Sequence, residues 1–276
     1  MTTGSAASDS VEQLRTLRDL TYAREHGVAT VTLDRPRAAN AYSSEMIASL
    51  ETVLRLVEAD DDVRVMVLTG AGSAFSAGGD LKDMAAARGM FGGAPAELLK
   101  HYELGLQRMA LAFERLSKPV VAAINGHAIG GGLTLACMCD IRVCSADARL
   151  GSTFVQVGLV PADGSTFVLP RTIGFSRALD LMLTGRLIDA QEAREMNLVD
   201  EVVPAAEVLP RALAKAALIA AAPPIAVQLT KRACYSTARM SMEASLELVA
   251  GYQAIAQRTE EHFQAVRRLL ERKPSR

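Results

Sequence analysis

Residues 126–134 read Gly126-His127-Ala128-Ile129-Gly130-Gly131-Gly132-Leu133-Thr134, between an apolar run, Val120–Ile124, and a helix-forming stretch, Leu133–Met138. This order predicts a buried strand, a tight turn and a helix. Glycines let the chain turn with nothing above the backbone amides, and the first four amides of a helix have no intrahelical acceptor. The turn therefore predicts a site for an anion, either a bound phosphate or a negative oxygen that forms during a reaction.

A second loop has the same arrangement. Residues 75–82, Phe-Ser-Ala-Gly-Gly-Asp-Leu-Lys, also follow an apolar run and precede a short predicted helix that begins at Asp80. If the two turns face each other, the amides of Gly79 and Gly131 converge on one oxygen. A thioester carbonyl that becomes an enolate needs two such donors, and losing one typically costs about 3 kcal/mol of barrier stabilisation. The alternative is that each glycine loop is only a tight turn required for packing.

The composition indicates a globular protein with a large core. The chain has 276 residues, is half hydrophobic and carries a net charge of −1, which fits one large domain or one domain with an appendage. It has no Trp, few Tyr or Phe, and no basic stripe that would follow a phosphate backbone. A nucleic-acid partner is therefore not expected.

The chain also lacks the usual signs of secretion, membrane insertion or metal binding. Residues 1–10 are small and polar without an apolar h-region, so we expect a flexible tail and a cytoplasmic location. The most apolar long window, 212–230, is interrupted by Lys215 and Pro223-Pro224, which favours buried helices over a membrane span. The four cysteines are expected to be buried thiols, and the four histidines show no metal-ligand spacing.

Strand-like and helix-like segments alternate along the first 206 residues. This alternation predicts an α/β core over 17–206, after a flexible tail over 1–16 and before a C-terminal helical region over 207–276. The expected strands are Leu17–Arg24, Val28–Leu33, Val63–Leu68, Val120–Ile124 and Asp140–Cys144. Ser43 is expected to cap a helix, and Pro95 to begin another after a flexible segment, Met84–Ala94. The expected C-terminal helices are Val208–Ala221, Ile225–Ala238 and Met242–Leu270.

An ordered series of motifs runs through the whole chain. They are Asp34-Arg35-Pro36, Asn40-Ala41, Ala74 to Lys82, Lys118-Pro119-Val120, Ile124 to Gly132, Cys139 to Arg142, Gly158 to Pro161, Leu169-Pro170-Arg171, Leu183-Thr184-Gly185 and Ala190 to Val203. In this order they resemble the enoyl-CoA hydratase/isomerase, or crotonase, superfamily. The resemblance extends from the first strand to the last helix and is therefore far more specific than one glycine motif.

This resemblance implies a fold, a ligand and an assembly. The implied fold is α/β, a crotonase-like spiral of ββα units with a C-terminal helical region, and members are usually homotrimers or dimers of trimers. The implied ligand is an acyl-CoA thioester, whose coenzyme A is part of the substrate and not a separate cofactor. By the same resemblance, Ala39, Ala77 and Gly79 lie along the CoA channel. Lys231 approaches the nucleotide phosphates or, alternatively, is an exposed helix lysine.

The two glutamates that hydratases of this family use are not found at the matching positions. One position, two residues past the glycine triplet, holds Thr134, and ungapped counting back from Gly158 places the other at Phe154. Neither a phenyl ring nor a threonine hydroxyl replaces a carboxylate as an acid or base near neutral pH. Phe154 either lines an acyl pocket or packs in the core, and Thr134 either holds a water molecule or packs in its helix.

Another carboxylate, Asp163, lies in Pro161-Ala162-Asp163-Gly164-Ser165. Some isomerases and a dehalogenase of the family carry a functional Asp in a similar stretch, but by ungapped counting theirs matches Ala162. Asp before Gly is also a good turn former without any catalytic role. If Asp163 faces the acyl chain, partial burial raises its pKa and lets it move a proton between carbons.

The remaining polar residues near the predicted site have simpler interpretations. Asp80 is placed to cap a helix, with Asp83 adding negative charge to the first turn. His127 is interpreted as a packed loop residue. His101 and Glu103 reach an acyl pocket only if the segment before them folds over it.

Three functions follow from these residues. The favoured one is an enoyl-CoA isomerase that stabilises a thioester enolate with Gly79 and Gly131 and transfers a proton with Asp163. The second is a divergent hydratase or acyl-CoA hydrolase that positions water through Thr134. The third, from a different class, is a CoA-ester-binding subunit without turnover.

Overall fold

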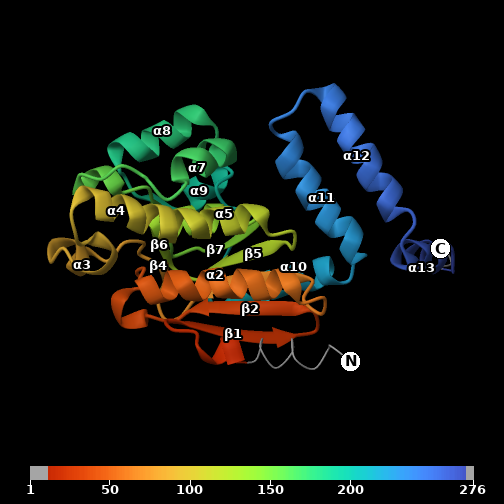
Figure 1. The fold of residues 1–276 in the computed structure, drawn as a ribbon, viewed down its shortest axis with the longest axis horizontal. Coiled ribbons are helices and arrows are strands. Elements are labelled where there is room, and N and C mark those ends of the chain that lie inside the picture. Colours follow the sequence, from red (N-terminus) through yellow and green to blue (C-terminus); the bar gives the residue numbers. More distant parts are fainter. Residues whose placement is uncertain (1–11, 272–276) are drawn as a thin grey trace.

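Two β-sheets form the frame of the molecule, and the computed structural model describes residues 12–271 (Figure 1). The larger sheet has the strand order β1-β2-β3-β5-β7-β10, and the smaller has the order β4-β6-β8-β9. In the larger sheet β1 and β2 are antiparallel, and the other neighbours are parallel. The strands are β1 (Leu20–Glu25), β2 (Val28–Leu33), β3 (Val65–Gly70), β4 (Ala74–Ser76), β5 (Val120–Ile124), β6 (His127–Ile129), β7 (Ile141–Ser145), β8 (Arg149–Gly151), β9 (Ile188–Asp189) and β10 (Glu201–Val203).

The chain builds both sheets by repeating one unit. From β3, β5 and β7 in the larger sheet it passes directly to β4, β6 and β8 in the smaller sheet. A helical segment then returns it to the start of the next unit. This arrangement confirms the predicted spiral of ββα units.

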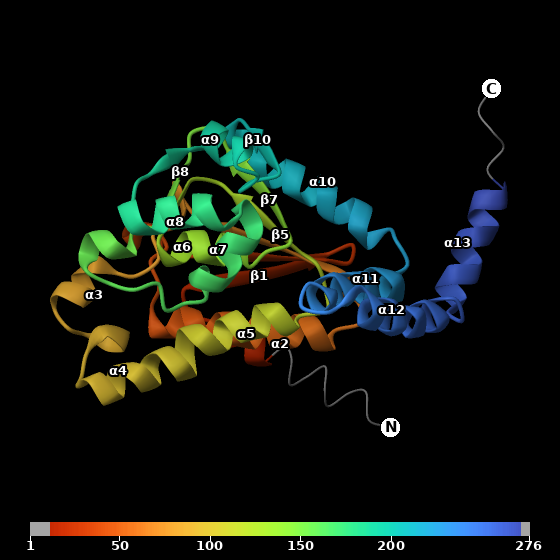
Figure 2. The same cartoon turned by 90° about the horizontal axis from the view of Figure 1, so that it is seen from above.

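Helices cover both faces of the larger sheet (Figure 2). On β3, Val65 and Val67 face a cluster that includes α10, whereas Met66 and Leu68 face the main core beneath α2 and α5. This alternation follows from the two-residue period of a strand that is buried on both sides. The helices are α2 (Ser44–Ala59), α3 (Leu81–Ala85), α4 (Pro95–His101), α5 (Gln107–Arg115), α6 (Gly131–Cys137), α7 (Ser165–Ile173), α8 (Phe175–Thr184), α9 (Ala190–Glu195), α10 (Val208–Ala220), α11 (Pro224–Thr237), α12 (Met242–Ala256) and α13 (Glu260–Glu271).

Between α4 and α5, residues Tyr102–Leu106 form a π-helical turn. The amide of Gln107 donates to the carbonyl of Tyr102, five residues earlier. The expected helix from Pro95 is therefore continuous, but its second half is rotated relative to an ideal α-helix.

The last predicted helix, Met242–Leu270, is instead two helices, α12 and α13. Thr259 lies at the break, where its hydroxyl donates to Ala256 O (2.8 Å) and accepts from the amide of His262 (3.2 Å). A threonine followed by two glutamates is a helix N-terminal signal, and it outweighs the apolar periodicity that suggested one long helix. Other boundaries differ by a few residues: α6 begins at Gly131 instead of Leu133, and β3 runs two residues later than predicted.

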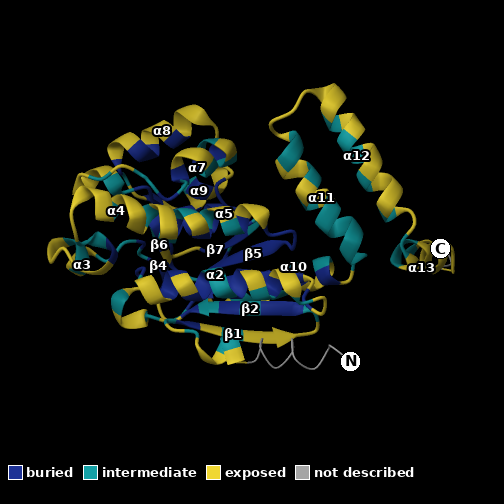
Figure 3. Cartoon of the chain, in the orientation of Figure 1, coloured by how far each residue is buried: buried dark blue, intermediate teal, exposed yellow. Residues whose placement is uncertain are grey.

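The C-terminal part of the described chain, from α10 to α13, is helical, and part of it stands off the core (Figure 3). Helix α10 packs on the larger sheet through Val208, Ala212, Ala216 and Ala220, so the part that stands off the core begins at α11. No described residue of α11, α12 or α13 is buried. Of the predicted tail, residues 1–11 lie outside the described part, and 12–15 are helical.

Two further expectations concern the segment Met84–Ala94 and the possibility of a membrane-spanning helix. The segment Met84–Ala94, expected to be flexible, contains the end of α3 and a 3₁₀ turn, Gly89–Phe91, in which Met90 is buried. Within residues 12–271 no single helix has the length and apolarity to cross a membrane. Only the pair Ala205–Ala220 and Pro224–Thr237, bent by 107°, passes such a test together.

Candidate active site

The two glycine loops lie against each other because the strands before them are neighbours. Strands β4 and β6 are parallel partners in the smaller sheet, so the loops that follow them leave the same edge. A Cβ atom added to Gly78, whose φ is +72°, would lie 2.5 Å from Gly131 N. One added to Gly132 would lie 2.0 Å from Ser76 O. Only glycine permits this approach of the two backbones.

Two backbone amides where the loops meet have no acceptor within the described residues. Gly131 is the first residue of α6, so its amide has no acceptor within that helix. The amide of Gly79 donates no backbone hydrogen bond within the described residues. Gly130, with φ of +53°, makes the turn into α6 that side chains rarely permit.

A cleft of about 550 Å³ opens in front of these loops. It contains the predicted residues Ala39, Ala77, Gly79, Gly131 and Phe154. Arg37 and Lys82 provide cationic groups in its wall. The structure therefore brings together on one surface five residues from four separate segments of the sequence.

Asp80 lines the same cleft but has a structural role. Its carboxylate accepts from the amides of Lys82 (3.0 Å) and Asp83 (3.4 Å) at the start of α3 and pairs with Arg35 (3.2 Å). Burial by itself raises the pKa of Asp80. The amide hydrogen bonds and the Arg35 charge outweigh that effect, so the pKa lies below its usual value of 3.8.

A small cavity of about 30 Å³ continues from the cleft into the protein. The two spaces share Gly79, Met84, Gly131, Phe154 and Leu159. The remaining cavity residues are Tyr42, Phe91, Tyr102, Leu106, Val160, Ala162 and Asp163. Asp163 is the only carboxylate among the cavity residues of the described chain.

The Asp163 carboxylate has one satisfied oxygen and one free one. Oδ1 accepts from Ser165 Oγ (2.8 Å) and from the Ser165 amide (3.2 Å), and the residue is 2% exposed. Oδ2 has no hydrogen-bond partner within the described residues and lies 3.3 Å from the position of a Cβ on Gly131. Burial raises the pKa of Asp163, and the nearby hydroxyls of Thr134 and Ser165 oppose that rise without cancelling it.

Thr134 and Lys231 do not line the cleft or the cavity. Thr134 is buried in α6, where its hydroxyl donates to Gly130 O (3.3 Å). Lys231 on α11 is neither exposed nor free: its ammonium pairs with Asp140 (2.8 Å) and donates to Lys118 O (2.9 Å). The described chain thus places the Lys231 ammonium in a structural ion pair.

The sequence analysis missed eight residues that line the cavity: Tyr42, Met84, Phe91, Tyr102, Leu106, Leu159, Val160 and Ala162. His101 and Glu103, considered as candidates, flank Tyr102 but do not line the cavity. His127 accepts a hydrogen bond from the Arg149 amide (3.0 Å). A usable signal for Tyr42 was its position directly after Asn40-Ala41, which belongs to the motif series.

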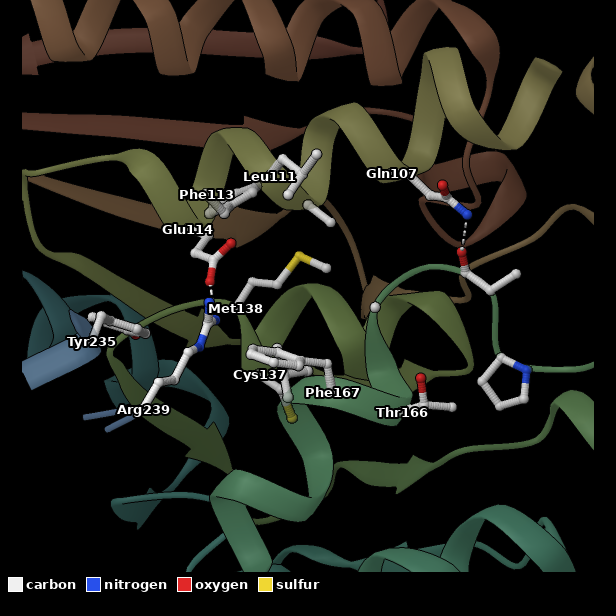
Figure 4. Close-up of a pocket in the computed structure, with 15 residues that line it drawn as sticks. Gln107, Leu111, Phe113, Glu114, Cys137, Met138, Thr166, Phe167, Tyr235 and Arg239 are labelled. Atoms are coloured by element: carbon white, nitrogen blue, oxygen red, sulfur yellow. Dashed lines mark hydrogen bonds and ion pairs between the residues drawn. The ribbon is translucent and has the colours of Figure 1, made fainter. Parts of the chain in front are cut away.

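A second cavity, of about 540 Å³, lies between α5, α6, α7 and α11 (Figure 4). Figure 4 shows Met138, Phe167 and Leu111 around it and the Glu114–Arg239 ion pair at one end. It borders Pro161, Ala162 and Gly164, the segment that also carries Asp163. None of the predicted site residues lines it.

Comparison with known proteins gives one consistent result. A family model for enoyl-CoA hydratase/isomerase matches residues 23–276. The 1,2-epoxyphenylacetyl-CoA isomerase of Escherichia coli is 36% identical over 89% of this chain and 93% of its own. The crystal structure of an enoyl-CoA hydratase from Bacillus anthracis superposes with a TM-score of 0.86 at 33% identity, covering 92% of this chain and 96% of that one. An enoyl-CoA hydratase structure from Mycobacterium smegmatis gives a TM-score of 0.86 at 31% identity, covering 94% and 98%.

Proposed function

This chain belongs to the enoyl-CoA hydratase/isomerase family, and from that premise we propose that it is an enoyl-CoA isomerase. The acyl-CoA thioester enters the cleft with its carbonyl between the amides of Gly79 and Gly131. Asp163 transfers the proton. The substrate contributes its own coenzyme A, and the proposal requires no separate cofactor.

The reaction needs one base and one oxyanion site. The Asp163 carboxylate removes a proton from C2 of a 3-enoyl-CoA, and the electron pair moves to the thioester oxygen. The two amides stabilise the resulting dienolate. The carboxylic acid then returns the proton to C4, which gives the 2-enoyl-CoA and restores the carboxylate.

One observation supports this assignment more than any other. The free oxygen of Asp163 lies in the same cavity as Gly79 and Gly131, whereas residues 134 and 154 hold no carboxylate. Hydration by the family's two glutamates therefore lacks its acid and base here. The cationic side chains of Arg37 and Lys82 in the cleft wall suit the phosphates of coenzyme A.

A hydratase is the second candidate, because solved structures that match this fold are named as enoyl-CoA hydratases. The inner cavity of about 30 Å³ also has the volume of one water molecule beside Asp163. In this version Asp163 and not Thr134 activates the water, since Thr134 lies outside the cavity.

Incubation with 2-enoyl-CoA and 3-enoyl-CoA esters separates these candidates. Isomerisation interconverts the two esters, hydration gives a 3-hydroxyacyl-CoA, hydrolysis releases free coenzyme A, and a non-catalytic binding subunit changes neither ester. We expect isomerisation, with kcat reduced at least about 100-fold in Asp163→Asn. The matched control is Asp147→Asn, an exposed turn carboxylate outside the cleft. Full activity of Asp163→Asn would remove Asp163 from the mechanism.

A further inference from the structure

Tyr42 contacts both glycine loops at once. Its backbone amide donates to Gly78 O (2.6 Å), and its backbone forms a parallel bridge with Gly79. Its phenolic hydroxyl donates to Gly131 O (2.7 Å), 89 residues further along the chain. The residue is 2% exposed and lines the cavity that contains Asp163.

The phenol fits closely against the second loop. A Cβ atom on Gly131 would lie 2.7 Å from Tyr42 Cε2, so the ring fills the space in which a side chain would otherwise stand. Burial raises the pKa of Tyr42 well above its usual value, and the nearby Asp163 adds to the rise. The hydroxyl therefore remains protonated, and because Gly131 O only accepts, the hydrogen bond has one direction.

The second loop needs an external restraint of this kind. Residues 130–132 are three successive glycines, the residue type with the widest choice of backbone conformations. Oxyanion stabilisation depends on donors that are held in place before the charge develops. Tyr42 is fixed to the first loop by its backbone and to the second by its side chain.

We propose that Tyr42 is a positioning residue that holds the amides of Gly79 and Gly131 in register on one thioester oxygen. This inference rests on the proposed function. Tyr42 does not touch the reacting carbons. It fixes the geometry of the groups that do.

Tyr42→Phe tests the proposal because it keeps the ring and removes only the hydroxyl. We expect kcat for isomerisation to fall about tenfold while KM changes less than twofold, since a loosened oxyanion site weakens transition-state binding more than substrate binding. The control is Tyr235→Phe, which removes a phenolic hydrogen bond to Asp140 (2.8 Å) outside the cleft. A purely structural role of Tyr42 would lower the melting temperature and leave kcat of the folded enzyme unchanged.

Vibrational spectroscopy gives a readout that does not need turnover. Butyryl-CoA, isotopically labelled at its thioester carbonyl, has no double bond to move. Its carbonyl band should shift to lower frequency on binding to the wild type and to Tyr235→Phe, and by about half as much in Tyr42→Phe. Equal shifts in all three proteins would overturn the role of Tyr42. The absence of a shift in the wild type would instead refute the proposed oxyanion site.

Discussion

At the scale of single residues, the surroundings of two carboxylates near the cleft shift their pKa values in opposite directions. Asp163 is buried with one oxygen unpaired, and burial raises its pKa. Asp80 is surrounded by amide donors and Arg35, which lower its pKa despite partial burial. A raised pKa in an acid means that the folded state disfavours the charge, and a lowered pKa means that it favours the charge.

Neutral substitutions of these two residues should therefore change stability in opposite directions. Above an unfolded pKa of about 4 the wild type carries the cost of ionising buried Asp163, so Asp163→Asn should raise the melting temperature, increasingly as the pH rises from about 4 to the raised pKa of Asp163. Asp80→Asn should lower the melting temperature at pH 7, and its effect should vanish as the pH falls through the lowered pKa of Asp80. Thermal unfolding followed by circular dichroism across this pH range measures both. A lower melting temperature for Asp163→Asn at pH 7 would contradict the assigned environment.

The activity should follow the ionisation of the same group. A carboxylate base works only when it has lost its proton, so isomerisation should rise with pH through the raised pKa of Asp163. The measurement is kcat/KM against pH for the wild type. A profile that is flat throughout the acid limb would argue against Asp163 as the base.

Residue-level prediction from sequence succeeded where a motif carried the information. Gly79, Gly131, Ala39 and Ala77 were placed by the ordered motif series, and all four line the cleft. Tyr42 was missed because its partner, Gly131, is 89 residues away and no local pattern signals a phenol-to-carbonyl bond. The pairing of Lys231 with Asp140 was not predicted, because nothing near Lys231 in the sequence indicates that Asp140 lies opposite.

At the scale of elements, the two glycine loops restrict each other's side chains, because their backbones lie in close contact. Gly78 and Gly132 each bring backbone atoms of the other loop within 2.5 Å of the place where a side chain would begin. Such positions tolerate no Cβ atom without movement of the main chain. The sequence shows that these positions are glycines, but it does not show which backbone atoms of the other loop contact them.

Alanine substitutions should lower the free energy of unfolding at glycines that contact another backbone segment, and should have little effect at glycines without such a contact. Gly78→Ala combines a close contact with a positive φ and should lower the free energy of unfolding by about 1–3 kcal/mol. Gly251→Ala, in exposed α12 with nothing within 4 Å, should be neutral or raise that free energy by up to about 1 kcal/mol. Urea unfolding measures both. Equal effects of the two substitutions would contradict the close approach of the loops.

Helix α11 is held to the core by an ion pair whose side chains are largely shielded from solvent. Lys231 and Asp140 are 8% and 16% exposed, and Tyr235 donates to the same carboxylate. Lys231→Met leaves that carboxylate without its cation and should destabilise the protein by about 3 kcal/mol. Hydrogen exchange should become faster in α11, whereas Arg232→Met, at an exposed position of the same helix, should change little. Unchanged exchange in Lys231→Met would show that other contacts fix α11.

At the scale of the whole molecule, the three C-terminal helices lie off the core and carry apolar side chains in solvent (Figures 1 and 3). Met242, Leu246, Ile255, Leu269 and Leu270 are each more than half exposed in the single chain. Exposed apolar surface of this kind is typical of an interface between subunits. It supports the proposal that the protein is a homotrimer or a dimer of trimers.

Sedimentation should then give three or six times the mass of one chain. Leu246→Asp, on α12, should shift the distribution toward smaller species because it places a charge in the proposed interface. Leu179→Asp on α8, which lies apart from α12 in Figure 1, should leave the assembly intact. A wild type that sediments as a single chain would refute the assembly.

The π-helical turn at Tyr102–Leu106 gives this architecture one more property. An extra residue in a helical turn rotates everything after it by roughly 100°. Tyr102 lines the cavity while its neighbours His101 and Glu103 do not, so the rotation of the helix decides which side chain lines the cavity. Loss or gain of a single codon in this stretch would exchange an aromatic wall for an imidazole or a carboxylate. Substrate preference in such a protein is thus able to evolve by an insertion or deletion that leaves Gly79, Gly131 and Asp163 unchanged.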